Sequence, residues 1–313
     1  MFLGIDTSNY TTSLALVSDE GKVLANYKKL LPVKQGDLGL RQSDAVFHHV
    51  RQLPELFSQM QEEFGTLSDR LKGIGVSVRP RDLEDSYMPC FTVGRSFADS
   101  IGALVGVKPH YFSHQCGHIA AALYSADRMD LMDKQFVAFH FSGGTSEAVL
   151  CKPDETCVIS ATQVAGSLDL KAGQVIDRVG GMLGLAFPAG PALDALAQKS
   201  NREYHIKPTM KGYDPCMSGI ENQCRTMLQK GETPEDIAKF AIASVCAVVD
   251  RMSQDCKMRF GDLPIIYAGG VMSNSYISKY ITKKHNGSFA QPQFSSDNAV
   301  GVALLSAFRS GCF

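Results

Sequence analysis

The sequence lacks several features that would point directly to a class of protein. It contains no tryptophan, which removes one stacking residue from any base-binding surface. It contains no run of about 18 apolar residues, so no membrane-spanning helix is expected. Its 31 Lys and Arg residues against 32 Asp and Glu residues leave no strong net charge. The composition therefore gives no sign of a general nucleic-acid-binding protein, although a local basic groove is compatible with it.

The cysteines form no recognisable disulfide or zinc framework. There are nine of them, an odd number, and no CxxC pair occurs. In a chain of 313 residues this pattern indicates reduced, mostly buried thiols and a cytoplasmic protein. The opening MFLGIDTSNY shows neither a basic leader nor a cleavage site and is typical of a strand that begins at once.

The first part of the chain reads as three strands followed by alternating helices and strands. Strands are predicted in FLGID, TTSLALVSD and VLANYKKLL, and later in LKGIGVSV and HYFS. Helical spacing over residues 42–60 predicts a helix with Ser43 and Asp44 as candidate caps, which Pro54 could kink or split. Further helices are predicted in FTVGRSFADSIGALVGV, with Gly106 as its stop, and in CGHIAAALYSA.

A second series with the same order begins near residue 134. FVAFHFSGGTSEAVLC and CVISAT repeat the strand, polar turn, strand, strand pattern of the opening, about 135 residues later. This predicts an α/β protein of two similar lobes, residues 1–133 and 134–313, each with a mixed central sheet and helices. The second lobe would carry a helical insertion near 170–260, with helices over 170–183, 191–200, 219–228 and 234–260. The segments LPIIYAGGVMSNSYI, SFAQP and DNAVGVALLSAF predict a strand–turn–helix, a short strand and a closing helix.

Three small turns follow apolar strands: DTSN, FSGGTS and AGGVMSN. Such turns can aim backbone N–H groups at an anion, and a following helix adds its dipole. One Gly pair is most often only a turn. Three such small turns after apolar strands, two of them in repeated hairpins, indicate a two-lobed protein that closes on a phosphate-bearing ligand.

The stretch FSHQCGHIAAAL places His114 and His118 four residues apart in a predicted helix. At this spacing both imidazoles lie on one face, about one turn apart, which suits binding of a single metal ion. Alternatively, two of the eight histidines fall at this spacing by chance and serve as caps or core groups. Cys116 would point to the opposite side of a regular helix, so we interpret it as a small buried residue that joins the metal only if the segment is not helical.

Eight segments carry a more specific signal: FLGIDTS, FTVGRSFA, SHQCGHIAA, FSGGTSEAVL, AGQVIDRVGGMLGLAFPAGP, MSGIE, AGGVMSN and SSDNAVGVA. In this order and spacing they resemble the TsaD-type tRNA N6-adenosine threonylcarbamoyltransferases, a family once classed as glycoproteases. The resemblance runs through nearly the whole chain. It implies the duplicated actin/sugar-kinase-like (ASKHA) fold and transfer of a threonylcarbamoyl group from an adenylate donor to adenosine in tRNA.

The resemblance also implies roles for individual residues. An iron or zinc ion would be held by His114, His118 and Asp297. The phosphate part of an ATP or adenylate-type ligand would lie in the turn formed by Ser142, Gly143, Gly144, Thr145 and Ser146. The nucleoside part would contact Asp177, Gly190 and Asn274, and the facing hairpin would supply Asp6 and Ser8 as catalytic residues. Plainer interpretations stay open: the turn as an ordinary tight hairpin, Asp177 as a solvent-facing acid and Asn274 as a helix cap.

The sequence departs from the family pattern at several of these places. Tyr10 and Thr11 replace the two acids of ETSCDE, Cys116 replaces the Glu between the histidines, and Thr145 replaces the His of SGGHT. The charged loop RPRDLEDSYMP replaces an apolar Gly-rich one, and IDR replaces FDK. A lost carboxylate is a lost candidate general base. These departures indicate a divergent paralogue.

Two functions follow from this pattern. The first is metal-dependent transfer of a threonylcarbamoyl or related carbamoyl group to tRNA, with small accessory proteins and a related actin-like subunit as further partners and no membrane. The second is a non-catalytic or regulatory nucleotide-binding protein that pairs with a related subunit. The old peptidase assignment is rejected, because the helix lacks the Glu that zinc peptidases use as base.

Overall fold

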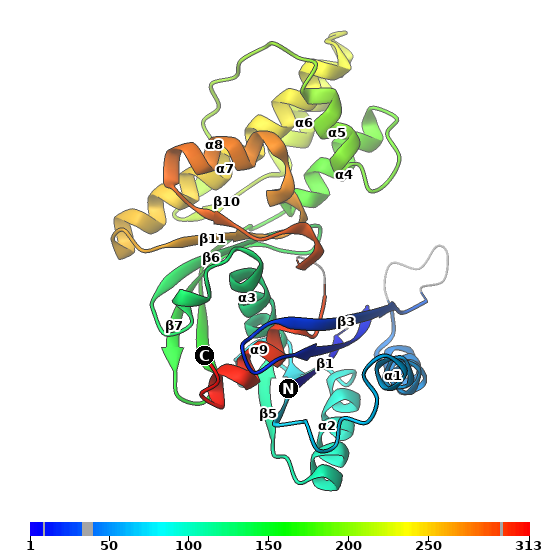
Figure 1. Ribbon diagram of the computed structural model, residues 1–313. Coiled ribbons are helices and arrows are strands. Elements are labelled where there is room, and N and C mark those ends of the chain that lie inside the picture. Colours follow the sequence, from blue (N-terminus) through cyan, green and yellow to red (C-terminus); the bar gives the residue numbers. More distant parts are fainter. Residues whose placement is uncertain (9, 33–39, 295–296) are drawn as a thin grey trace. The chain divides into compact units, whose positions relative to one another are not determined.

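The computed structural model describes residues 1–8, 10–32, 40–294 and 297–313 (Figure 1). These residues fall into two compact units, each built on a five-stranded sheet. The first unit comprises the described residues of Met1–Lys134, Lys152–Ala161 and Ser296–Phe313, and the second those of Gln135–Cys151 and Thr162–Ser295. One boundary between the two units falls after Lys134. However, two segments of the expected lobe 134–313, the closing helix among them, belong to the first unit.

The two sheets repeat one strand order. The first consists, in spatial order, of β3 (Val23–Leu30), β2 (Thr11–Val17), β1 (Phe2–Ser8), β4 (Gly73–Arg79) and β5 (Pro109–Ser113). The second consists of β8 (Val158–Gly166), β7 (Ser146–Asp154), β6 (Phe136–Phe141), β11 (Ile265–Ala268) and β12 (Ser288–Phe289). In the first sheet, β1 pairs antiparallel with β2 and parallel with β4. In the second, β6 likewise pairs antiparallel with β7 and parallel with β11. The internal repeat expected from the sequence is therefore a repeat of sheet topology, and the fold is α/β with two mixed sheets.

In the first unit, helices cover both faces of the sheet (Figure 1). The helical elements are α1 (Gln42–Phe64), α2 (Phe91–Val105), α3 (His114–Ser125), η1 (Met129–Leu131) and α9 (Val300–Arg309). Alternation along β1 separates the faces, since Thr7 lies against Gly94 of α2 while Gly4 lies against the start of α9. The same alternation places Asp6 on the α9 side.

Glycines let α9 approach the sheet and α3 closely. A Cβ added to Gly4 or Gly75, which are paired across β1 and β4, would lie 2.2 or 1.9 Å from a backbone oxygen at the start of α9. A Cβ on Gly301 would lie 1.7 Å from the backbone oxygen of Gly117 in α3. Only glycine fits such contacts. This packing explains why the end of the chain belongs to the first unit.

One local expectation for α1 needs correction, and for another one of its two alternatives is excluded. The helix begins after Arg41 with no side-chain cap, so the prediction that Ser43 or Asp44 caps it was wrong. The helix also runs through Pro54 without being split. Leu53 and Leu56 are buried on either side of the proline, and their packing against the sheet outweighs the lost backbone hydrogen bond. At the end of α2, Gly106 adopts φ of 72° and closes the helix as predicted.

The second unit adds its helices around the sheet β8-β7-β6-β11-β12. They are α4 (Ala172–Met182), α5 (Gly190–Ala197), α6 (Ser218–Gln229), α7 (Pro234–Phe260), η2 (Gly270–Ser273), α8 (Ser275–His285) and η3 (Pro292–Phe294). The helices predicted from periodicity lie within a few residues of these bounds. The small hairpin of β9 (Met210–Lys211) and β10 (Asp214–Pro215) was not predicted. Helix α7 supplies the centre of the core, with residues such as Ala241, Val245 and Val249 fully buried.

None of the helices in the described part of the chain combines the length and apolarity needed to span a bilayer.

Candidate metal centre and ligand cavity

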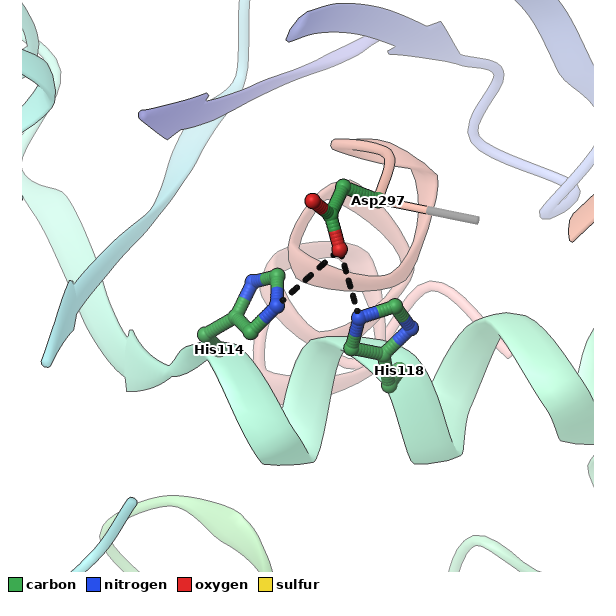
Figure 2. A group of neighbouring side chains, drawn as sticks. All are labelled: His114, His118 and Asp297. Atoms are coloured by element: carbon green, nitrogen blue, oxygen red, sulfur yellow. Dashed lines mark hydrogen bonds and ion pairs between the residues drawn. The ribbon is translucent and has the colours of Figure 1, made fainter. Parts of the chain in front are cut away.

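Two histidines and one aspartate of the first unit converge at the start of α3 (Figure 2). His114 and His118 lie one turn apart on one face of the helix, with their ring centroids 4.4 Å apart. Their Nε2 atoms lie 3.5 and 3.2 Å from one oxygen, Oδ1 of Asp297, which just precedes α9. Each of the three residues offers one ligand atom, and these three atoms lie within 4.8 Å of one another. The structure thus brings together the three predicted metal ligands.

The donor set suits a transition metal. Imidazole nitrogens and a carboxylate oxygen bind zinc and ferrous iron, and three protein ligands leave coordination positions for water or substrate. The side chains are 20%, 15% and 28% exposed for His114, His118 and Asp297, so an ion could reach them from solvent. The residues present therefore fit a bound ion.

Opposite charges dominate the electrostatics of this centre. Burial alone would raise the pKa of Asp297, but both histidines hold it well below its ordinary value. Burial would likewise lower the pKa of His114, but Asp6 and Asp297 raise it to about 10. A metal ion would have to displace the proton that these carboxylates stabilise, so metal affinity should fall in acid.

Asp6 lies behind His114 and orients its ring. Its carboxylate is 1% exposed and accepts hydrogen bonds from Ser8 Oγ at 2.8 Å, from His114 Nδ1 at 3.1 Å and from Ser77 Oγ. Since Nδ1–H of His114 is held by Asp6, Nε2 is the nitrogen that faces Asp297. Burial would raise the pKa of Asp6, yet His114 and Ser77 keep it below its usual value. The two residues predicted as catalytic, Asp6 and Ser8, are thus both buried beneath the centre.

A further carboxylate, Asp82, fastens the first turn of α3 and was not singled out in advance. Asp82 Oδ2 accepts from Ser113 Oγ at 2.7 Å and from Cys116 Sγ at 3.0 Å, while Oδ1 accepts from Arg79. Ser113 in turn caps α3 by accepting from the Cys116 N–H. Cys116 is fully buried, in agreement with its expected orientation away from the histidines. The signals were present in the sequence as the charged loop and the Cys in place of Glu, but only folding joins them.

The second unit contains a cavity of about 550 Å³ at its glycine-rich turns. Five of the residues expected to bind nucleotide line it: Ser142, Gly143, Asp177, Gly190 and Asn274. The other three, Gly144, Thr145 and Ser146, do not. The cavity joins the turn after β6, the start of α4 and the Gly-Gly turn after β11, as the repeated pattern of turns suggests.

The turn after β6 is held by its own serines. Ser142 Oγ accepts the backbone N–H groups of Gly144 at 3.3 Å and Thr145 at 3.1 Å. Ser146, which is 2% exposed, accepts the Ala172 N–H at 2.9 Å and so positions the start of α4. Ser142 and Ser146 therefore shape the turn and fix α4 against it.

Asp177 and Asn274 brace the walls of the cavity. Asp177 Oδ1 accepts the Ala189 N–H at 2.9 Å and holds the segment that leads into α5. Asn274 Oδ1 caps α8 by accepting the N–H groups of Tyr276 and Ile277, which is the plainer of the two interpretations weighed for it. Gly173, not singled out from the sequence, packs so tightly that a Cβ there would lie 2.6 Å from the Gly143 nitrogen.

Comparison with solved structures defines the class of protein. The chain is similar to (R)-2-hydroxyglutaryl-CoA dehydratase component A of Acidaminococcus fermentans, with a TM-score of 0.57, 16% identity, and 99% and 98% of the two chains covered. It is also similar to a ROK family glucokinase of Streptomyces griseus, with a TM-score of 0.50, 12% identity, and 97% and 98% covered. At such identities these likenesses show the fold alone. The fold is the duplicated actin/sugar-kinase-like (ASKHA) fold.

Sequence comparison places the chain within that class. The model of the family TsaD, tRNA N6-adenosine threonylcarbamoyltransferase, matches residues 25–304, and the chain belongs to this family. A relative named tRNA N6-adenosine threonylcarbamoyltransferase in Thermosipho africanus is 27% identical, with 96% of this chain and 92% of the relative covered. One of the same name in Methanopyrus kandleri is 24% identical, with 96% and 85% covered.

Proposed function

We propose that the protein transfers a threonylcarbamoyl or related carbamoyl group from an adenylate donor to the N6 amine of adenosine in tRNA. The observation that carries this proposal is the convergence of His114, His118 and Asp297, residues from two distant parts of the chain, on a common point. Membership of a family whose relatives bear the name of this activity supports it.

The ion held by these three residues would be iron or zinc. When bound, it would act as a Lewis acid on a carbamoyl or phosphate oxygen of the donor. The chain's own residues position it: Asp6 fixes the His114 ring through Nδ1, and Ser8 and Ser77 fix Asp6. Asp6 and Ser8 therefore contribute to the reaction by presenting Nε2 of His114, since their burial keeps them from the substrate.

The cavity of the second unit would bind the ATP or adenylate part of the donor. Its volume of about 550 Å³ is within the usual range for small-molecule sites. Gly143, which lines the cavity, has open space where a side chain would be, so a phosphate could approach the backbone there. Asp177, Gly190 and Asn274 would border the nucleoside.

A second candidate, a non-catalytic nucleotide-binding member that pairs with a related subunit, has one observation in its favour. Thr11, which replaces an acid of the family pattern, lies with Oγ1 3.4 Å from Asp297 Oδ2. Thr11, a residue that departs from the family pattern, thus lies against the proposed metal ligand Asp297. A neutral hydroxyl there cannot take a proton from an incoming amine as a carboxylate could.

The partners follow from the same proposal. They are tRNA, a related actin-like subunit and small accessory proteins of the modification pathway, in the cytoplasm. Two relatives named probable bifunctional tRNA threonylcarbamoyladenosine biosynthesis proteins are covered to 56% and 50% of their own length, in agreement with a protein that works beside another component.

Metal content and transfer should be measured on the same samples. We expect the wild-type protein to hold about one iron or zinc ion by elemental analysis, and to move label from threonylcarbamoyl-adenylate to tRNA. His118→Ala should lose both. His205→Ala, which changes an exposed histidine of the second unit, should keep both.

The outcomes separate the two candidates. Nucleotide binding without turnover in the wild type, unaffected by His118→Ala, would favour the non-catalytic member. A wild-type protein that takes up no iron or zinc on reconstitution would contradict the metal centre. If tRNA is the acceptor, its affinity should fall steeply with salt, and a flat salt dependence would point to a small acceptor.

A further inference from the structure

Two cysteine thiols of the first unit meet on one backbone oxygen. Cys116 Sγ, in the first turn of α3, lies 3.0 Å from Ile159 O, and Cys157 Sγ, in the turn before β8, donates to the same oxygen at 3.3 Å. Both sulfur atoms therefore lie within 3.3 Å of a single atom. The side chains of Cys116 and Cys157 also interact directly with each other, so the two thiols are neighbours.

The turn that carries Cys157 is tightly fixed. Asp154 Oδ1 accepts the N–H groups of Thr156 and Cys157 at 2.8 and 2.9 Å, and Arg309 of α9 donates to the Thr156 carbonyl. The next residue, Val158, adopts φ of 67°, a left-handed conformation that β-branched residues rarely take. Strain of this kind costs roughly 1–3 kcal/mol and persists where the surroundings hold it. Here the hydrogen bonds of Asp154 and Arg309 hold the turn that carries Cys157.

The two cysteines differ in access. Cys157 is half-buried, whereas Cys116 is fully buried, so Cys157 is the more accessible of the two residues to a small oxidant. This is the arrangement of an exposed reacting thiol with a resolving thiol at its side. Transient, regulatory disulfides of this kind are the ones that occur in reducing compartments.

We propose that Cys157 and Cys116 are a redox-active pair that a peroxide converts to a reversible disulfide. Peroxide oxidises the Cys157 sulfur to a sulfenic acid and releases one water. The Cys116 sulfur then attacks the Cys157 sulfur, forming the S–S bond and displacing hydroxide. The Cys116 proton passes to that hydroxide as a second water, with the Asp82 carboxylate, 3.0 Å away, as its first acceptor. Two thiols lose two electrons and the peroxide gains them, and a dithiol reductant reverses the change.

The disulfide would lower the metal affinity of the proposed centre. Cys116 lies in the helical turn between His114 and His118, and a bond to Cys157 withdraws its sulfur from Asp82, the group that fastens this turn. Partners that orient metal ligands typically change metal affinity by about 10–100-fold when lost. Oxidised protein should therefore bind zinc or ferrous iron at least about tenfold more weakly. This consequence rests on the proposed metal site, whereas the disulfide itself does not.

The experiment treats the reduced full-length protein with a small excess of hydrogen peroxide and maps its tryptic peptides by mass spectrometry. We expect a linked pair made of residues 96–128, which contain Cys116, and residues 135–171, which contain Cys157 and Cys151. The link should vanish with dithiothreitol and be absent in Cys157→Ser. Cys312→Ser, which changes another half-buried cysteine, should still form it.

The proposal has two parts, the cysteine pair and its effect on zinc affinity, and separate results test each. Absence of the linked peptide in the wild type, or its persistence in Cys157→Ser, overturns the cysteine pair. Zinc affinity, measured by chelator competition, should fall on oxidation in the wild type and in Cys312→Ser but stay unchanged in Cys157→Ser. A disulfide that forms with no change in zinc affinity overturns the coupling. Reduced protein that binds no metal refutes the proposed metal site, while peptide mapping still decides the pair.

Discussion

The crossing of α3 and α9 should control both stability and metal binding, and Gly301→Ala tests it. The new Cβ would lie 1.7 Å from the Gly117 oxygen, whereas carbon and oxygen atoms do not approach within 3.0 Å. The obstacle is backbone, so no side-chain rotation relieves it, and the two helices must separate by on the order of 1.5 Å. Overpacking of this kind costs about 1–3 kcal/mol, and we expect the upper end of that range.

The same displacement should disturb the metal ligands. His118 follows Gly117 directly, and Asp297 lies just before the helix that carries Gly301. Metal sites hold ligand distances to within about 0.2 Å, so a shift several times larger should abolish stoichiometric binding. Gly301→Ala should therefore lose the ion as well as stability, although it changes no ligand.

Two other glycines provide graded controls. A Cβ on Gly117 would lie 3.1 Å from a methyl group of Val302, which can yield, so Gly117→Ala should cost only about 1 kcal/mol. Gly181 is an exposed position of α4 with open space around it, and Gly181→Ala should be neutral or stabilise by up to about 1 kcal/mol.

Because the chain has no tryptophan, unfolding in urea should be followed by far-UV circular dichroism, with metal content measured on the same preparations. The reasoning is refuted if Gly301→Ala matches the wild type in unfolding midpoint and metal stoichiometry, or if the three variants fall in another order.

Three further predictions concern single residues. Asp82→Asn removes the carboxylate that fastens the start of α3, so zinc affinity in chelator competition should fall about tenfold, and an unchanged affinity would show that Asp82 is incidental. Burial lowers the pKa of His49 from 6.5 to about 4. Between these two pH values the unfolded chain therefore binds a proton at His49 that the folded chain does not bind. The free energy of unfolding should therefore fall by on the order of 3 kcal/mol as pH drops from 6.5 to 4, and His49→Gln should flatten that slope in urea titrations at several pH values. Asp177→Ala leaves the Ala189 N–H without its acceptor, so the variant should be about 1–2 kcal/mol less stable. Calorimetry should also show that it binds ATP more weakly than the wild type. ATP binding as strong as in the wild type would show that Asp177 is not part of the nucleotide site.

The sequence determined the local elements and their repetition. Alternating and 3.6-residue patterns gave the strands and long helices, because each pattern reflects the face that an element buries. The same four-residue spacing placed His114 and His118 on one side of α3 and Cys116 on the other. The repeat of strand, turn and strand reappeared as one sheet order used twice.

Single positions were less well predicted where packing competes with local preference. Pro54 should weaken a helix, yet the buried residues around it keep α1 continuous. Asn274 suited either a ligand contact or a cap; it caps α8 and also lines the cavity, so its contact with a nucleotide stays a prediction. The short hairpin of β9 and β10 was too brief to leave a periodic signal.

Tertiary structure alone decided which distant residues meet. The family resemblance had named Asp297 beside the histidines, but only the tertiary structure shows how it reaches them: glycines on β1, β4, α3 and α9 let the closing helix pack into the first unit. Asp82 reaches Ser113 and Cys116, and Cys157 reaches Cys116, by the same long-range folding. Sequence spacing determines on which face of a helix or strand a side chain lies. Which helices and strands come into contact depends on how closely their backbones can pack.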